Sequence, residues 1–497
     1  MSAAKTGEAP APSAHALSHW PDADEIEARY ARLMKAPLRP LRRDRMEAYL
    51  QQLAGRCSGS RALHERARQV IPGGVQHNLA FNYPFPLVVA GAAGAYLWDV
   101  DGNRYIDFLQ AGGPTVLGSN HGPVQEKVIE LIRGCGPVTG LFHEYELKLA
   151  ELVRRHMPAV EMFRMLGSGT EGVMAAIRVA RVHTGRKRVI KGGGAYHGWS
   201  DQMVFGLHVP GSGALEAAGI PAGALKETQE FAPNDLEGLR ALLVKNQERG
   251  GTAAVILEPL GPESGTRPVR RDFNQGVRAL CDEFGALLIF DEVVTGFRLG
   301  LGGAQGYFGV RPDLTVFGKC IAGGYPAAGG VGGRREVMEH LSAGIGGVGE
   351  RAYVGGTLSA NPLSCAAGYH ALLEMERTGA ALAAGRAGDR LCRGLQRLIE
   401  EHELPYVAYN YGSIVHLQTS GVLLLSLMDP QALAEIKPRK HMMEEMGAAM
   451  TAEGVVSLAG SRLYTSMADT DAVIDDALAR LARVLEGVEG VEAGRRA

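Results

Sequence analysis

The chain has 497 residues, of which 46% are hydrophobic and 21% charged, and its formal net charge is -2. This length exceeds what one simple core can hold, so we expect one large domain and at least one smaller one. The balanced charge, without a long run of Lys or Arg, argues against nucleic acid or an anionic membrane as a partner. No segment resembles a secretory signal or a membrane span, and the scattered cysteines fit a reducing compartment. We therefore expect a cytoplasmic protein, and no motif predicts a metal site.

Residues 1–57 are predicted to form an N-terminal extension, disordered up to about residue 20 and helical from about residue 22 to residue 56. This extension could pack on its own chain or on a second subunit. Residues 58–120 are expected to contribute the first segment of the small domain and the entry to the large domain. Within them, AYLWDVDGNRYIDF (95–108) predicts two strands around a turn at Asp101 and Gly102.

Residues 121–372 alternate between helical patterns and short apolar strands, which are predicted at 188–191, 253–257, 286–290, 314–317 and 327–331. Apolar strands separated by helices are typical of a mostly parallel sheet with helices on both faces, so we expect a large α/β domain. Residues 373–497 predict a small C-terminal α/β domain that closes with a helix at 471–485. Ligands of such sheets bind at the carboxyl ends of the strands.

Four short motifs could carry chemistry, and each has an ordinary structural alternative. The sequence SGT (168–170) precedes an amphipathic helix, whose N-terminus attracts anions, although a plain N-cap explains it too. Asp291 ends a predicted strand, where it could hold a cationic heterocycle or simply cap a turn. Lys319 ends another, where a lysine withdrawn from water could form an imine, or could lie on the surface. GGT (355–357) suits a phosphate contact or a turn.

The order and spacing of these motifs resemble the class III aminotransferases of pyridoxal 5'-phosphate (PLP) fold type I, and the nearest branch is that of the glutamate-1-semialdehyde 2,1-aminomutases. The matching stretches cover most of residues 58–485 and include WDVDGNRYIDF (98–108), GSGTEGVMAAIRVAR (167–181), YHG (196–198), LLIFDEVVTGFR (287–298), GGAQGYFGVRPDLTVFGKCIAGG (302–324) and GGTLSANPLSCAAG (355–368). The first 57 residues lie outside the resemblance. It implies a PLP-dependent enzyme and a homodimer with its active sites at the subunit interface.

The resemblance also implies roles for individual residues. Lys319 would hold PLP as a Schiff base and move a proton between the substrate carbon and the cofactor. Asp291 would pair with the pyridinium nitrogen, so that the ring acts as an electron sink. Tyr196 would stack on one face of the ring and Val293 on the other. A loop at 211–226 would gate the site, and the alternative for it is a plain surface loop. The cofactor phosphate would be held by Ser168, Gly169 and Thr170, and by Thr357 of the neighbouring subunit.

The substrate positions depart from the aminomutase pattern. The arginine that binds the substrate carboxylate in that branch corresponds to Ala80, and the arginine of a branch that acts on β-amino acids corresponds to His77. Glu263 replaces an asparagine of the aminomutases. Some ω-aminotransferases of this class carry a glutamate here that pairs with an arginine, and Arg462 falls near the place of that arginine. The alternative is that Glu263 and Arg462 are both exposed or are paired elsewhere.

Three functions remain open at this stage. An aminotransferase that exchanges an amino group between an amine or amino acid and a keto acid or aldehyde is favoured, because the carboxylate arginine is missing. An intramolecular aminomutase is the alternative. A relative that has lost catalysis is disfavoured, because the three expected catalytic residues, Lys319, Asp291 and Tyr196, are all present.

Overall fold

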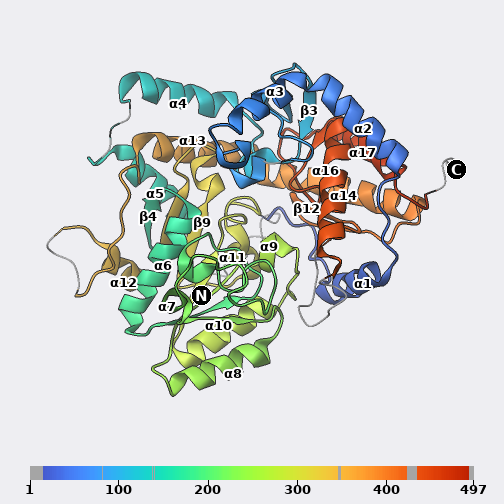
Figure 1. Ribbon diagram of the computed structural model, residues 1–497. Coiled ribbons are helices and arrows are strands. Elements are labelled where there is room, and N and C mark those ends of the chain that lie inside the picture. Colours follow the sequence, from blue (N-terminus) through green and yellow to red (C-terminus); the bar gives the residue numbers. More distant parts are fainter. Residues whose placement is uncertain are drawn as a thin grey trace, which may run out of the picture.

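The computed structural model describes residues 15–80, 82–136, 138, 140–344, 349–422 and 434–491. In Figure 1 a large domain, built around a central sheet, lies beside a smaller domain that contains the C-terminal part of the chain. The N-terminal helices α2 and α3 lie next to this smaller domain in the same view. None of the helices in the described ranges is long and apolar enough to cross a membrane.

The large domain is built on a seven-stranded sheet in the order β4-β10-β9-β8-β7-β5-β6. Its strands are β4 (Met162–Leu166), β5 (Arg188–Gly192), β6 (Thr228–Phe231), β7 (Thr252–Leu257), β8 (Leu287–Asp291), β9 (Leu314–Gly318) and β10 (Gly329–Gly333). The strands from β9 to β6 pair in parallel, and β10 runs antiparallel to both of its neighbours. The predicted mostly parallel sheet is therefore confirmed. The strands β4 and β6 were not predicted, and β10 begins two residues later than expected.

Alternate residues of the central strands pack against different helices. In β7, Val255 and Leu257 share a core with the helices α8 (Leu236–Gln247) and α10 (Phe273–Phe284). Ala254 and Ile256 of the same strand share a core with α6 (Gly169–Thr184). Because successive strand side chains point to opposite faces, an apolar run such as TAAVIL is suited to a sheet that helices cover on both sides.

The strand β10 has the sequence GGVGG and lies unusually close to its neighbours. A Cβ atom on Gly329 would lie 2.1 Å from the Ser168 carbonyl oxygen, and one on Gly333 would lie 2.2 Å from the Asp313 carbonyl oxygen. Glycine is required at both positions because any side chain would displace backbone atoms.

Further helices of the large domain surround the sheet: α4 (Gly122–Gly134), α5 (Glu144–His156), α7 (Ala222–Leu225), α9 (Pro262–Gly265), α11 (Gly303–Phe308), α12 (Arg335–Met338) and α13 (Pro362–Thr378). Short 3-10 helices are η1 (Pro72–Gly74), η2 (Asn78–Ala80), η3 (Gln110–Gly112), η4 (Asp201–Met203), η5 (Lys319–Ala322) and η6 (Glu339–Leu341). The expected domain boundary after residue 372 falls inside α13. We propose Gly379 as the boundary, because it has a left-handed backbone (φ 63°) and separates α13 from α14.

The small domain contains an antiparallel sheet of β11 (Val407–Tyr411), β12 (Ile414–Gln418) and β14 (Arg462–Tyr464), together with the helices α14 (Ala380–Glu401), α16 (Ile436–Ala452) and α17 (Asp471–Leu485). A second sheet joins β1 (Val89–Ala93), β2 (Tyr96–Asp99) and β3 (Arg104–Asp107) to β13 (Val455–Val456). The predicted hairpin at 95–108 and the predicted closing helix at 471–485 are confirmed. Residues near position 100 thus pair with residues near position 455.

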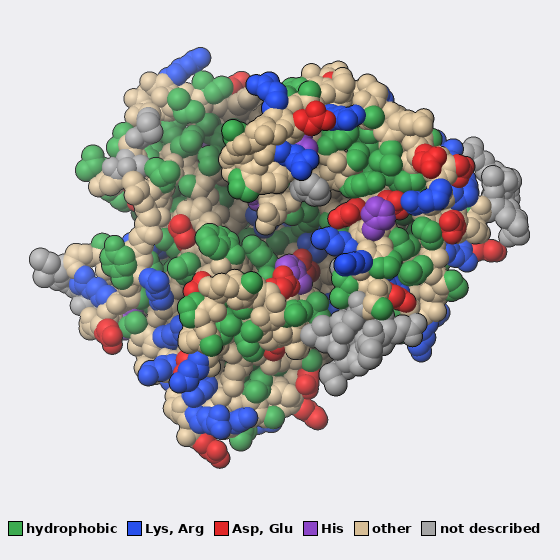
Figure 2. Space-filling view, in the orientation of Figure 1, with side chains coloured by type: hydrophobic (Ala, Val, Ile, Leu, Met, Phe, Trp, Pro, Cys, Tyr) green, Lys and Arg blue, Asp and Glu red, His purple; other side chains and the backbone are tan. Residues whose placement is uncertain are grey.

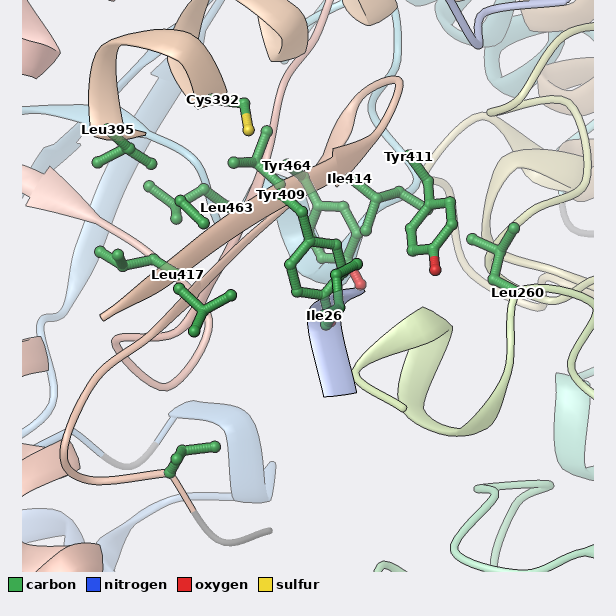
Figure 3. Close-up of a cluster of buried hydrophobic side chains, with 14 of the residues drawn as sticks. Ile26, Leu260, Cys392, Leu395, Tyr409, Tyr411, Ile414, Leu417, Leu463 and Tyr464 are labelled. Atoms are coloured by element: carbon green, nitrogen blue, oxygen red, sulfur yellow. The ribbon is translucent and has the colours of Figure 1, made fainter. Parts of the chain in front are cut away.

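The N-terminal extension packs on its own chain through α1 (Ala23–Lys35) and α2 (Arg43–Arg56), and α3 (Ser58–Ala67) follows. The helix α1 contacts β11, and its Ile26 joins an apolar cluster that includes Leu417 and Leu463 of the small domain (Figure 3). The predicted disorder is wrong for residues 15–20, because Ala16 and Leu17 are buried there. The composition of residues 1–20 does not show that Ala16 and Leu17 are buried. Residues 1–14 lie outside the described part of the chain.

Candidate active site

Asp291 and Lys319 lie at the carboxyl edge of the central sheet, where ligands of α/β proteins bind. Asp291 is the last residue of β8, and Lys319 directly follows β9. The two strands pair in parallel, so both residues lie at the same edge. Lys319 has a left-handed backbone (φ 47°), which a residue with a side chain adopts only under local constraint. A Cβ atom on Gly113 would lie 3.7 Å from the Lys319 Cδ and 3.5 Å from the Tyr464 ring, so both side chains lie beside Gly113.

Asp291 is held in place by a buried histidine that the sequence analysis did not single out. Its Oδ2 lies 2.7 Å from Nδ1 of His197, and its Oδ1 accepts a hydrogen bond from the backbone N–H of Val293 at 3.1 Å. Burial lowers the pKa of His197, and the contact with Asp291 offsets only part of this. A neutral His197 with its proton on Nδ1 donates to Asp291 and fixes its carboxylate. The only sequence signal for this role was the position of His197 directly after Tyr196.

The start of α6 is pressed against the strand ends at positions where only glycine fits. A Cβ atom on Gly169 would lie 2.7 Å from Val293, and one on Gly318 would lie 2.8 Å from Val293, so this valine is wedged between two glycines. Ser168 caps the helix by accepting a hydrogen bond from the Glu171 N–H at 3.2 Å. The first N–H groups of a helix have no intrahelical partner, so this N-terminus can bind an anionic group.

Three other predicted residues lie on the surface of the chain. Tyr196 is about half exposed, and its ring lies 6.4 Å from that of His208 at an interplanar angle of 21°. Thr357 is exposed, so its predicted contact with a neighbouring subunit stays a prediction. His77 is also exposed and accepts a hydrogen bond from the Leu79 N–H at 3.0 Å. Within the described ranges, no hydrogen bond or ion pair joins His77 to the other predicted residues, and its substrate role stays a prediction.

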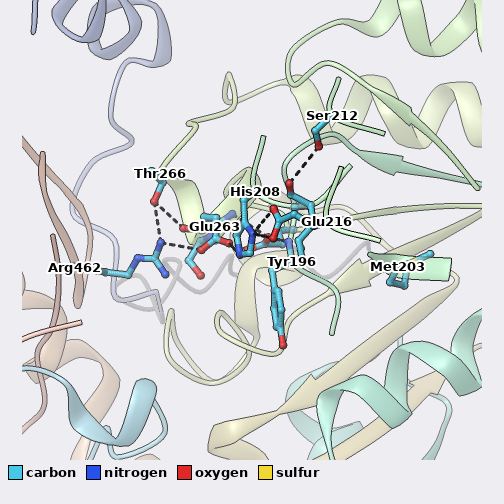
Figure 4. Close-up of polar contacts among 12 residues, drawn as sticks. Tyr196, Met203, His208, Ser212, Glu216, Glu263, Thr266 and Arg462 are labelled. Carbon is cyan, nitrogen blue, oxygen red and sulfur yellow. Dashed lines mark hydrogen bonds and ion pairs between the residues drawn. The ribbon is translucent and has the colours of Figure 1, made fainter. Parts of the chain in front are cut away.

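Glu263 and Arg462, which lie far apart in the sequence, come together at the junction of the two domains (Figure 4). The Arg462 Nη2 lies 3.4 Å from the Glu263 Oε2 and donates a hydrogen bond to the Thr266 Oγ1 at 2.9 Å. The Arg462 side chain is 13% exposed and that of Glu263 is 30% exposed. The pair is therefore largely shielded from solvent, although each member belongs to a different domain.

Glu263 also faces a loop that precedes β6. Its Oε1 lies 3.6 Å from the His208 Nε2, and the His208 Nδ1 lies 2.9 Å from the Glu216 Oε1. Figure 4 shows His208 between the two carboxylates. The predicted gating loop at 211–226 includes Glu216, so Glu263 is linked both to the small domain and to this loop. His208 was not predicted, because no local motif marks it.

The buried carboxyl group of Glu258, in the large domain, holds the backbone of the turn that carries Glu263. Glu258 follows β7, and its Oε1 accepts hydrogen bonds from the N–H groups of Tyr196 at 3.1 Å and Glu263 at 3.0 Å. Its Oε2 accepts one from the Ser264 N–H at 2.7 Å. Burial, and then the nearby Glu263 and Asp291, raises the pKa of Glu258 to about 8. Glu263 and Ser264 have left-handed backbones (φ 57° and 56°), which cost on the order of 1–3 kcal/mol each, so Glu258 stabilises a strained turn.

Comparisons with known proteins identify the family of this chain. The aminotransferase class-III family matches residues 80–420. A glutamate-1-semialdehyde 2,1-aminomutase from Acetivibrio thermocellus is 43% identical over 367 residues, which cover 72% of this chain and 82% of that protein. An omega-transaminase from Sphaerobacter thermophilus superposes with a TM-score of 0.75 at 29% identity, over 86% of this chain and 97% of that one. A beta-phenylalanine aminotransferase from Variovorax paradoxus superposes with a TM-score of 0.76 at 28% identity, over 89% of this chain and 97% of that one.

The chain belongs to the class III aminotransferase family. It is a PLP-dependent enzyme of fold type I, either an aminotransferase or an aminomutase. The residues present fit this cofactor. A carboxylate fixed by His197 suits a ring nitrogen, a lysine lies at the neighbouring strand end, and the N-terminus of α6 suits a phosphate.

Proposed function

We propose that this enzyme is an aminotransferase that moves an amino group between an amine or amino acid and a keto acid or aldehyde. The contact between Glu263 and Arg462 carries this proposal. A pocket that accepts both an uncharged and an anionic substrate end needs an arginine for the anion. Such an arginine is costly when it is shielded from water without a partner. Glu263 neutralises Arg462 while an amine is bound and moves away when a dicarboxylate enters.

The remaining residues act on the cofactor side. When bound, PLP supplies an electron sink for charge that develops on the substrate carbon. Lys319 attaches the cofactor and moves a proton at that carbon. Asp291, oriented by His197, keeps the ring nitrogen protonated. Tyr196 and Val293 bracket the ring.

The phosphate is held by residues of two subunits in this proposal. Ser168, Gly169 and Thr170 provide the N-terminus of α6. Thr357, which is exposed in the single chain, reaches the phosphate of the neighbouring subunit. The enzyme therefore acts as a homodimer, and we place it in the cytoplasm.

An aminomutase is the second candidate, and the relative from Acetivibrio thermocellus, at 43% identity, favours it. Against it, Ala80 and Glu263 depart from the aminomutase pattern. Both residues would contact the substrate rather than the cofactor, so the overall identity carries less weight than these two positions.

One experiment separates the two candidates. The purified enzyme with PLP is incubated with a panel of amines and either pyruvate or 2-oxoglutarate. Loss of amine that depends on the keto acid supports the aminotransferase. Isomerisation of glutamate-1-semialdehyde without any acceptor supports the aminomutase and rejects our proposal. The variant Lys319→Ala is the blank for both reactions.

A further inference from the structure

We infer that the N-terminal extension helps to build the substrate site, and that Tyr30 of α1 is a positioning residue for Arg462. Tyr30 acts through the backbone of residues 263–266, which carry Glu263 and Thr266. The matched family region begins only at residue 80, so α1 lies outside it. This inference rests on the proposed role of Arg462 as the binding residue for an anionic substrate end.

Tyr30 holds the end of this turn through its hydroxyl group. The side chain is 7% exposed, and its OH donates a hydrogen bond to the Thr266 carbonyl at 3.0 Å. The same OH lies 2.7 Å from the OH of Tyr409, which in turn lies 2.8 Å from the Gly265 carbonyl oxygen. Burial raises the pKa of both tyrosines, so both hydroxyls keep their protons and can donate. Each hydroxyl has one proton, so when Tyr30 donates to the Thr266 carbonyl, Tyr409 donates either to the Gly265 carbonyl or to the Tyr30 oxygen. In both arrangements Tyr30 holds the Thr266 carbonyl.

Thr266 connects this backbone segment to the ion pair of Glu263 and Arg462. Its Oγ1 donates a hydrogen bond to the Glu263 carbonyl at 3.0 Å and accepts one from the Arg462 Nη2 at 2.9 Å. Figure 4 shows the Thr266 side chain directed at the guanidinium group. A displacement of the Thr266 backbone therefore moves a hydrogen-bond partner of Arg462 and changes the distance between Arg462 and Glu263.

The turn needs support because its backbone is strained. Besides the left-handed Glu263 and Ser264, a Cβ atom on Gly261 would lie 2.1 Å from the Arg267 carbonyl oxygen. Such a conformation persists only where its surroundings fix it. The buried Glu258 fixes the N–H groups on one side of the turn.

The carbonyl groups on the other side are fixed by the small domain and the extension. His416 lies 3.1 Å from the Ser264 carbonyl oxygen, Tyr409 holds Gly265, and Tyr30 holds Thr266. Of these supports, Tyr30 alone comes from the extension. The helix α1 is also tied to the large domain by the ion pair between Asp24 and Arg270 at 2.7 Å, so it contacts both domains at their junction.

The test compares Tyr30→Phe with the matched control Tyr49→Phe. Tyr49 lies in α2 of the same extension, is 4% exposed, and donates from its OH to the Arg483 carbonyl at 3.3 Å, away from the turn. Both changes remove one buried hydroxyl and leave the ring. Glutarate, a dicarboxylate without an amino or keto group, is titrated into each holoenzyme by calorimetry. Hydrogen exchange of the backbone amides at 258–267 is measured in parallel.

We expect Tyr30→Phe to raise the glutarate Kd by about two- to tenfold, the factor that one hydrogen bond of this kind contributes. Its amides at 258–267 should exchange faster than in the wild type, and Tyr49→Phe should change neither quantity. In turnover, the KM for 2-oxoglutarate should rise while the half-reaction with a monoamine is unchanged.

Unchanged exchange at 258–267 in Tyr30→Phe overturns the inference, and so do equal effects of the two substitutions on glutarate binding. Failure of the proposed function gives a different result. If the wild-type enzyme consumes no amine in the presence of pyruvate or 2-oxoglutarate, the proposed aminotransferase function is rejected. A wild type that does not bind glutarate rejects the anion-binding role of Arg462, and with it the role assigned to Tyr30.

Discussion

Asp291 ends one strand of the central sheet and Lys319 directly follows the neighbouring strand, whereas Glu263 and Arg462 lie on a strained turn and on a strand of the other domain. The backbone hydrogen bonds of a continuous sheet fix the first pair. Side chains from several separate segments fix the second. In our proposal, Asp291 and Lys319 on the cofactor side determine whether the reaction occurs, and Glu263 and Arg462 on the substrate side determine which molecules react. Variants on the two sides should therefore affect the two half-reactions differently.

The largest effect is expected from Lys319→Ala. The wild type with PLP should show a visible absorption band that borohydride bleaches, because our proposal attaches the cofactor to Lys319. The variant should lose this covalent attachment and all measurable turnover in both half-reactions. Mass spectrometry after borohydride treatment checks the attachment. Turnover near that of the wild type would refute the assignment of Lys319.

Asp291→Asn should keep the cofactor and lose about 10²-fold or more in both half-reactions. A neutral side chain stabilises the protonated ring nitrogen less than a carboxylate does, and removal of one preorganised electrostatic contact typically costs about this much. Half-reaction rates with an amine and with a keto acid, measured by stopped-flow absorbance, check this. An effect on one half-reaction alone would show that the two sides are not separable as proposed.

Arg462→Ala should slow one half-reaction far more than the other. The half-reaction with 2-oxoglutarate should slow by about 10- to 100-fold, because a hydrogen bond between charged groups contributes about 1.5–3 kcal/mol. The half-reaction with a monoamine should change little. Glu263→Gln is a matched variant, since it keeps the shape but not the charge beside Arg462. Equal impairment of both half-reactions by Arg462→Ala would refute the switch.

Thr357→Ala should weaken PLP binding by about tenfold, through loss of one hydrogen bond to a charged group across the proposed dimer interface. Equilibrium dialysis against PLP measures the Kd. Thr170→Ala tests the contact proposed within the same chain and should have an effect of similar size. A Thr357→Ala variant that binds PLP as tightly as the wild type would reject the contact between subunits.

The smallest effect concerns pH and the buried Glu258. Burial raises the pKa of Glu258 to about 8 in the folded chain. The protonated carboxyl group therefore contributes fully to the free energy of unfolding below the ordinary pKa of a glutamate, and this contribution is lost as the pH rises through about 8. Thermal unfolding of the wild type and of Glu258→Gln is compared from pH 5 to pH 9. The Tm of the wild type relative to the variant should fall by a few degrees over this range. A difference that does not vary with pH would contradict the raised pKa.

Much of the fold was predictable because the central strands are apolar runs separated by helices. The strand β10 was displaced in the prediction, since GGVGG has little β propensity and is held extended by its antiparallel pairing with β4 and β9. The strand β1 (VAGAA) was missed for a similar reason, because alanine and glycine are depleted in strands. Residues 15–20 were expected to be disordered because composition does not show that a short segment has a complementary surface on its own chain.

For the site, the motifs predicted residues whose roles depend on strand ends, and the pairing of Glu263 with Arg462 came from the resemblance. The roles of His197, His208 and Glu258 were not predicted, because these residues contact Asp291, Glu263 and Tyr196, which are distant in sequence. The contact of Tyr30 with Thr266 spans 236 positions, and no local pattern could show it.

The glycines of β10 bear on how this enzyme could be engineered. In a saturation-mutagenesis library, Gly329 and Gly333 should tolerate substitution as poorly as catalytic residues, because a side chain there would collide with the backbone at Ser168 and Asp313. Loss of activity at these positions would report steric exclusion and not participation in the reaction. A library aimed at new amine substrates should therefore keep this strand constant and vary positions such as His208, whose side chain is about half exposed and lies beside Glu263.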